Sequence, residues 1–213
     1  MSSSPDKPHF SATDHRKGTV MKRVVTTLLF ASAAFVAPIG VSMAEDAKLA
    51  PIADYVKSEV NPWLNDPTVI EAIKAQDTAN ANLSEADIDA LDKKWRAEVD
   101  GSDHSMIDGV LGNALSKFLQ AKKEASGGKI TEIFVMDAKG LNVGQSDVTS
   151  DYWQGDEAKF QKSFGAGKDA IFVDEIEKDE STQTLQSQAS ITISDESGTP
   201  IGAVTIGVNV DAL

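Results

Sequence analysis

The chain has 213 residues, with 20 basic and 33 acidic side chains, a formal net charge of −13, and no cysteine. This negative charge repels nucleic acid and anionic membrane surfaces, and the absence of cysteine excludes disulfides and thiolate chemistry. We therefore expect no nucleic-acid partner and a core that is stable without covalent cross-links.

Residues 21–44 have the layout of a secretory signal peptide. A start residue and two basic residues at 21–23 precede an uncharged apolar run over 24–41, and a small-x-small cleavage site ends at Ala44. The run is only marginally long enough to span a bilayer. We predict cleavage after Ala44, and we interpret residues 1–20 as a disordered leader or a mis-assigned start.

Cleavage would release residues 45–213 into the periplasm as one domain without a membrane-embedded segment. The first 44 residues hold five basic and two acidic side chains, so the mature part carries 15 basic and 31 acidic residues, a net charge of −16. This charge favours neutral or cationic ligands over anionic ones.

The first part of the mature chain, residues 45–126, is predicted to be helical. Apolar residues recur there at three- and four-residue spacing, which is typical of amphipathic helices. Asn61-Pro62 ends the first stripe, because proline disfavours helical geometry in the preceding residue. Asp66-Pro67 starts the second helix as N-cap and first helical residue. The residues Ser84 to Asp87 resemble a capping box for the third.

The strongest helical stripe runs from Met106 or Ile107 to Leu119, and Gly127-Gly128 ends it. We expect this run to form one long helix that precedes the sheet. Its apolar face would pack on the strands that follow.

The second part, residues 129–213, is predicted to form a sheet. A short helix is expected at 156–163, and alternation from Leu185 to Ile193 indicates a strand with one buried face. Five strand candidates follow from the β-rich runs and turn signals: 130–136, 141–145, 170–176, 183–194 and 200–210. The sequence therefore predicts an α+β fold, with N-terminal helices and a long helix packed on a five-stranded antiparallel sheet.

Few residues carry recognisable catalytic or metal-binding chemistry. His104 is the one histidine of the mature part, so a zinc site built from nitrogen and sulfur ligands is excluded. The Gly165–Lys168 run does not complete a phosphate loop, and residues 137–142 lack the EF-hand pattern and are interpreted as a hairpin turn. We expect no enzyme activity, no catalytic residue, no metal and no cofactor.

An unusual pair of adjacent aromatic residues, Tyr152 and Trp153, lies among polar groups at 150–157. Either these rings pack over the sheet as a core lid, or they form the wall of a ligand pocket. Asp174 shares a strand face with Phe172 and Ile176, so it is the first carboxylate to test.

The order of these elements resembles the Cache family of extracytoplasmic, PAS-like sensor domains. The resemblance covers about residues 105–213 and rests on the hydrophobic-Asp-x-x-Gly hairpin at 133–140, the segments at 150–155 and 171–174, and the closing strand at 198–210. It implies a small-metabolite site between the sheet and the loops that cross it, at 151–156 and Asp174. The Arg- and Tyr-rich amino-acid signature of many members is missing, since no arginine follows Arg96, so the ligand class is not carried over.

From these observations we predict a soluble periplasmic, sensor-like module that binds a small polar metabolite over the sheet and presents it to a partner, such as a membrane receptor. The alternative is a structural or interaction protein that docks on an envelope receptor without a ligand of its own. The predicted ligand-binding residues are Asp151, Tyr152, Trp153, Gln154, Asp156, Phe172, Asp174 and Gln186.

Overall fold

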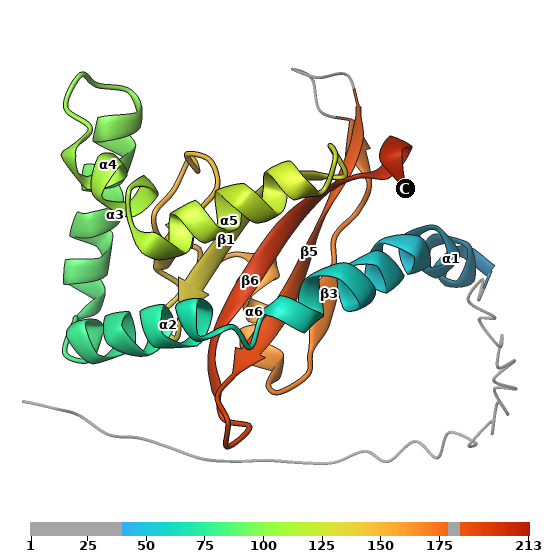
Figure 1. Ribbon diagram of the computed structural model, residues 1–213, viewed down its shortest axis with the longest axis horizontal. Helices are drawn as coiled ribbons and strands as arrows, with labels where there is room; N and C mark the ends of the chain where they lie inside the picture. The colour runs from blue at the N-terminus through green and yellow to red at the C-terminus, as the bar shows by residue number, and fades with distance from the viewer. Residues whose placement is uncertain (1–39, 179–183) are drawn as a thin grey trace, which may run out of the picture. The chain divides into compact units, whose positions relative to one another are not determined.

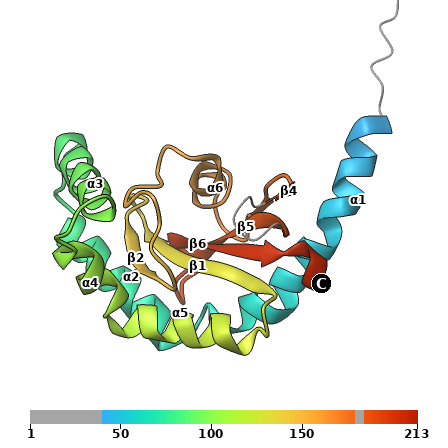
Figure 2. The ribbon, with the colours of Figure 1, turned by 90° about the horizontal axis from the view of Figure 1, so that it is seen from above.

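Three helices of the first half, at 40–55, 67–80 and 114–125, lie along one face of a sheet built by the second half, and the helices at 85–99 and 105–111 stand beside its edge (Figures 1 and 2). The computed structural model describes residues 40–178 and 184–213, with side chains from residue 48 onward. The predicted leader and residues 21–39 of the predicted signal peptide lie outside the described residues. No helix in the described part of the chain is long and apolar enough to cross a membrane.

The helices begin where the sequence supplies caps. Asp66 accepts a hydrogen bond from the Thr68 N–H at 2.8 Å, and the capping box of Ser84 and Asp87 is complete; both predicted helix starts are confirmed. The helical segments are α1 (Gly40–Tyr55), a π-helical turn (Val56–Val60), a 3-10 turn (Asn61–Trp63), α2 (Pro67–Asn80), α3 (Glu85–Val99), α4 (Ser105–Leu111), α5 (Ala114–Ala125), α6 (Ala158–Gln161) and two further 3-10 turns (Phe164–Ala166, Val210–Ala212).

The single long helix expected from about residue 106 to 119 is wrong, because the chain breaks between α4 and α5. The Asn113 side chain accepts a hydrogen bond from the Ser116 N–H at 2.7 Å and donates one to the Val143 carbonyl at 2.8 Å. An asparagine that bonds nearby backbone in this way favours a new N-cap over a continuous helix. As a result α5 lies along both β1 and β2, while α4 packs against β2 (Figure 2).

The sheet is antiparallel throughout, with the strand order β2-β1-β6-β5-β3. Its strands are β1 (Ile130–Asp137), β2 (Asn142–Gln145), β3 (Ile171–Val173), β4 (Glu177–Lys178), β5 (Leu185–Ser194) and β6 (Pro200–Asn209). The α+β class is confirmed, but the strand expected at 170–176 is shortened to β3, and the short β4 that follows it also pairs with β5. Just after β3, the Asp174 N–H donates to the Gln188 carbonyl at 2.8 Å, while the Asp174 carbonyl accepts from the Ser187 hydroxyl at 2.7 Å.

Pleating gives the sheet two different faces. The inner face packs its branched residues, such as Ile133, Val204 and Ile206, against buried side chains of α1, α2 and α5 in the main core. The outer face carries Phe134 and Met136 and is crossed by the segment that contains α6 (Figure 2). Ser187, Ala189, Ile191 and Ile193 of the predicted buried face of β5 are buried, but Ser190 and Thr192 on the opposite face are buried too and Leu185 is exposed. The prediction of a single buried face is therefore wrong for 189–193, because the outer face of the sheet is covered there as well.

The turn between β1 and β2 is the hairpin that the Asp-x-x-Gly pattern predicts. The fully buried Asp137 accepts hydrogen bonds from the Lys139 and Leu141 N–H groups and from Gln76 and Asn80 of α2, at 2.8 to 3.0 Å. Gly140 has a φ of +80°, and a Cβ there would lie 2.6 Å from the Gly155 Cα. Only glycine fits this conformation and this close approach, so the turn brings residue 155 over the hairpin.

Candidate ligand-binding site

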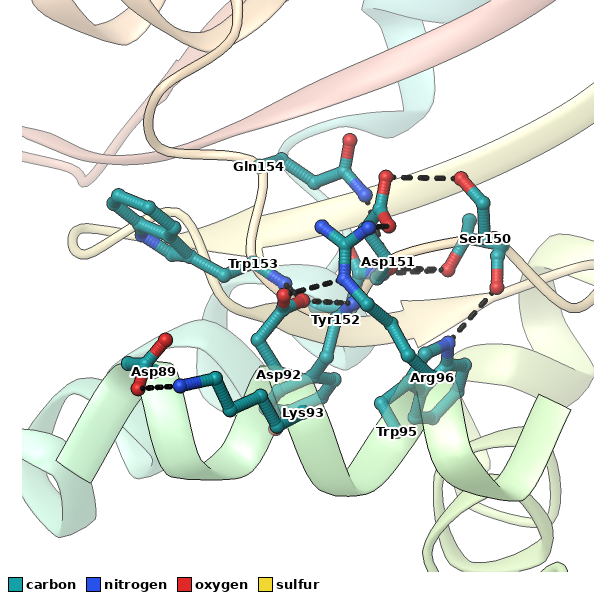
Figure 3. Close-up of polar contacts among 12 residues, drawn as sticks. Asp89, Asp92, Lys93, Trp95, Arg96, Ser150, Asp151, Tyr152, Trp153 and Gln154 are labelled. Atoms are coloured by element: carbon teal, nitrogen blue, oxygen red, sulfur yellow. Dashed lines mark hydrogen bonds and ion pairs between the residues drawn. The ribbon is translucent and has the colours of Figure 1, made fainter. Parts of the chain in front are cut away.

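A buried carboxylate of α3 holds the segment that carries the predicted aromatic pair (Figure 3). Asp92, 8% exposed, accepts hydrogen bonds from the Tyr152 and Trp153 N–H groups at 2.9 and 3.0 Å. Its other oxygen accepts one from Arg96 Nε at 2.7 Å. A buried carboxylate needs such donors to offset its lost hydration. The path of this segment is therefore determined by α3.

Arg96 extends this contact to a second carboxylate, as Figure 3 shows. Its Nη1 lies 2.7 Å from Asp151 Oδ1, while its Nε bonds Asp92. The hydrogen bond to Asp92 is the main cause that raises the pKa of Arg96 above its ordinary value. The arginine side chain is 57% exposed, so the ion pairs add little stability by themselves, but they fix the orientation of Asp151.

The sequence left two roles open for the aromatic pair, packing in the core or forming the wall of a ligand pocket. Tyr152 takes the packing role. Its ring stacks on Trp95 with centroids 5.4 Å apart, in a cluster that also contains Leu141 and Ile107. The Trp95 indole N–H donates to the Thr149 carbonyl at 2.8 Å. Tyr152 therefore closes the core between α3 and the hairpin instead of facing the outer side of the sheet.

Trp153 also serves to attach the segment. Its indole N–H donates to the Lys139 carbonyl at 2.8 Å, and its backbone forms an isolated bridge with Leu141. The ring is half-buried. Asp156, three residues later, is exposed, so these two predicted site residues do not meet in one cavity.

Three buried amide side chains gather at the β2 end of the outer face, and we call them the amide cluster: Asn142, Gln145 and Gln154. They are 0%, 0% and 2% exposed. Asn142 and Gln145 pair across the strands with Met136 and Phe134, which places both on the outer face. The three are joined by hydrogen bonds from Asn142 Nδ2 to Gln145 Oε1 and the Asp151 carbonyl, both at 3.1 Å, and from Gln154 Nε2 to the same carbonyl at 3.0 Å.

Each member of the amide cluster has one polar atom left over. Asn142 Oδ1, Gln145 Nε2 and Gln154 Oε1 are buried and have no hydrogen-bond partner among the described residues. Leaving such an atom unpaired costs about 1–3 kcal/mol. Native proteins normally pair these atoms with ordered water or a ligand. The amide cluster is therefore the strongest candidate for a binding site over the sheet.

An apolar patch and one paired lysine border the amide cluster. Phe134 and Met136 pack with Phe160 of α6. Lys159 Nζ lies 5.4 Å from the centre of the Phe134 ring and 2.9 Å from Glu157 Oε2. A few oriented polar groups beside apolar side chains are the usual composition of a small-molecule site.

The remaining predicted residues lie at the other end of the sheet. Phe172 is in cross-strand register with Ser190 on the outer face, and Lys162 Nζ lies 4.5 Å from its ring centre. Asp174 and Gln186 line a separate polar hollow of about 180 Å³. The structure thus divides six of the eight predicted residues between the α3 contact, the amide cluster and this hollow, whereas Asp156 and Phe172 belong to none of the three.

Two other cavities contain none of the predicted residues. One is a groove of about 690 Å³ between α2, the start of α5 and Val143. The other is a polar cavity of about 330 Å³ beside the β5–β6 turn. No group of three or more histidine or acidic side chains in the described part of the chain is arranged to hold a metal ion.

Sequence reasoning missed Asp92, Arg96, Asn142 and Gln145. Asp92 and Arg96 are visible as an i,i+4 pair on one helix face, but nothing local connects them to residues 151–153. Asn142 and Gln145 lie in the predicted hairpin return, where a bulge at Val135/Met136 places both on the same face. An excess of amide side chains on a short strand was the one available signal.

The burial of Tyr152 predicts a loss of stability at alkaline pH. Burial raises the pKa of Tyr152 from 10.0 to about 12, and the charge of Asp137 adds to it. Between these values the unfolded chain releases a proton that the folded chain keeps, so stability present below pH 10 is lost as the pH rises. Between pH 10 and 12 we expect the free energy of unfolding of the unsubstituted protein to fall by about 2–3 kcal/mol more than that of Tyr152→Phe.

Urea unfolding at stepped pH measures the difference between the two proteins. Tyr152→Phe keeps the stacked ring but has no phenol, so the other titrating groups cancel in the comparison. Parallel pH curves for the two proteins would contradict the prediction.

Comparisons with known proteins found a likeness to solved structures at low sequence identity. No family model and no curated protein matches the sequence. Similar solved structures include the sensor domain of the V. cholerae histidine kinase DctB, at 9% identity and a TM-score of 0.40, which covers 80% of this chain and 56% of that one. The E. coli DcuS sensor domain has 13% identity and a TM-score of 0.46, covering 78% and 94%. The ligand-binding domain of the Pseudomonas aeruginosa PAO1 amino acid chemoreceptor PctC in complex with GABA has 10% identity and a TM-score of 0.40, covering 80% and 59%.

The chain thus spans little more than half the length of the DctB and PctC structures. All three structures are sensor or ligand-binding domains. In the order of its elements and in its antiparallel sheet, the chain is an α+β domain with helices packed on one face of the sheet.

Proposed function

We propose that this chain is a sensor-like module that binds a small polar molecule on the outer face of the sheet, beneath residues 149–166. One observation carries the proposal: three buried amide atoms in a single hydrogen-bonded cluster have no partner among the described residues. Without a ligand or water, these atoms would reduce the stability of the fold. A binding site accounts for their presence in an otherwise paired network.

The predicted site residues take different roles in this proposal. Gln154 contacts the ligand together with Asn142 and Gln145, while Asp151 orients two of these amides through its backbone carbonyl. Tyr152 and Trp153 hold the segment in place from outside the site. Phe172, Asp174, Gln186 and the exposed Asp156 form the far end and rim, and contribute less.

We further propose that the module acts in the periplasm and presents its bound ligand to a partner such as a membrane receptor. The signal-like sequence over 21–44 supports export, and the strong negative charge of residues 45–213 favours solubility.

A metabolite screen by thermal shift, followed by native mass spectrometry, tests the proposal on the full chain. A ligand at one hundred times its Kd adds about 2.7 kcal/mol to the stability, which raises the Tm of a protein of this size by about 5–10 °C. Gln154→Ala should remove most of this shift. Gln161→Ala is the matched control, because this glutamine of the same segment is exposed.

Asp174→Ala separates the two ends of the sheet and should leave the shift largely unchanged. If no compound raised the Tm, or if Gln154→Ala kept the full shift, the proposal would be wrong. A chain that binds no small molecule but retains an envelope partner would instead support the alternative of an interaction protein.

A further inference from the structure

The amide cluster specifies the hydrogen-bonding character of its ligand, because the protein already determines which atom of each amide is bonded and which is left unpaired. Gln145 Oε1 accepts from Asn142 Nδ2 at 3.1 Å and from the Thr149 hydroxyl at 3.3 Å, so its Nε2 is the outward atom. Asn142 Nδ2 faces three acceptors, including Thr149 Oγ1 at 2.9 Å, which leaves Oδ1 outward. Gln154 Nε2 is engaged by the Asp151 carbonyl, so its Oε1 is outward. A flip of any amide would place like groups against one another.

The unpaired atoms of the amide cluster are therefore two carbonyl oxygens and one NH2 group. Two acceptors require two donor hydrogens from a ligand, and the NH2 group requires one acceptor. A carboxylate has no donor, and an ammonium group has no acceptor. A primary carboxamide has two N–H donors and one carbonyl acceptor, which is the complementary set.

The two basic side chains that border the amide cluster, Arg96 and Lys159, are each paired with an acidic side chain. Arg96 bonds Asp92 and Asp151 at 2.7 Å each, and Lys159 is paired with Glu157 at 2.9 Å. A charged ligand group would thus be buried without a free counter-ion, which is unfavourable.

The wall of the site suits a short apolar substituent. Phe134 is the cross-strand partner of Gln145, and Met136 is that of Asn142, so both lie about 5 Å from an amide residue on the same face. Phe160 of α6 packs on them from above.

We propose that the amide cluster binds an uncharged ligand through a carboxamide-type group, meaning a primary amide or a urea, which has two N–H donors next to a C=O acceptor. This inference rests on the proposed function, since it names the ligand class of the same site. A site of this kind selects its ligand by the pattern of donors and acceptors, whereas a site for carboxylates or amines selects by charge.

Four fragments of similar size test the inference by ligand-observed NMR titration of the full chain: propionamide, propionate, propylammonium and methyl acetate. The last is uncharged but has no N–H donor. We expect propionamide to bind at least about tenfold more tightly than the other three. Gln145→Met keeps the side-chain volume but removes the donor and acceptor, and should weaken propionamide binding about tenfold. Gln161→Met, on the exposed side of the segment, should not change it.

Gln154→Met provides a second test if Gln145→Met does not fold. Tighter binding of propionate or propylammonium that depends on Gln145 or Gln154 would overturn the inference but leave the proposed function standing. Binding of methyl acetate as tight as that of propionamide would also overturn it. If no fragment bound and the metabolite screen gave no ligand dependent on Gln154, water would fill the site and both proposals would fail.

Discussion

Asp92→Ala is expected to lower the free energy of unfolding by about 2–6 kcal/mol, because it removes the shared acceptor of two backbone N–H groups. The change leaves the Tyr152 and Trp153 N–H groups without their acceptor and removes the bond to Arg96. Each buried donor left unpaired costs about 1–3 kcal/mol. Urea unfolding followed by circular dichroism measures the loss.

Asp89→Ala is the matched control, one turn earlier on the same helix (Figure 3). Asp89 bonds Lys93 at 2.7 Å, but the two side chains are 60% and 72% exposed. An exposed pair of this kind contributes about 0–1 kcal/mol. Equal losses in the two variants would show that Asp92 does not hold the segment 151–153.

Trp95→Ala is expected to cost about 3–5 kcal/mol, because it removes a fully buried indole and leaves a cavity. The ring stacks on Tyr152, and its N–H bonds the Thr149 carbonyl. The same unfolding experiment measures the effect. A loss below about 1 kcal/mol would contradict the packing described for this cluster.

Trp95→Phe separates the two contributions of the tryptophan. It keeps most of the apolar contact with Tyr152 but has no donor for Thr149, so its cost is expected near about 1–3 kcal/mol. Both Asp92→Ala and Trp95→Ala are also expected to reduce any ligand-induced rise in Tm, because they release the segment that carries Gln154. The α3 contact is then a support for the site, although it contributes no ligand-binding atom.

These two variants probe contacts that sequence analysis did not predict, although it predicted the elements that carry them. The helix start at Ser84 and the aromatic pair at 152–153 were both identified. That Asp92 accepts from residues 60 and 61 positions later in the chain follows only from the fold. The same is true of the pair formed by Gln154 and the Asp151 carbonyl over Asn142 and Gln145.

The amino-acid sequence by itself determined the features that depend on near neighbours. The N-caps at Asp66 and Ser84, the alternating apolar residues that mark β5 as a strand and the hairpin built by Asp137 and Gly140 each involve residues within a few positions of one another. Hydrogen bonds and steric limits of this range are encoded in residue type and spacing. They were sufficient for the α+β class and for the order of the elements.

Only the tertiary structure decided how the candidate site is assembled. Asn113 ended one helix and began another because a carbonyl of β2 was available to its side chain. Tyr152 turned toward α3 because Trp95 and Asp92 offered a stacking surface and a buried acceptor there. The amide cluster formed because a bulge placed Asn142 and Gln145 on one face, beneath a segment held by a distant helix. Contacts of this kind depend on which apolar surfaces are buried together, and that is determined by the whole chain rather than by local sequence.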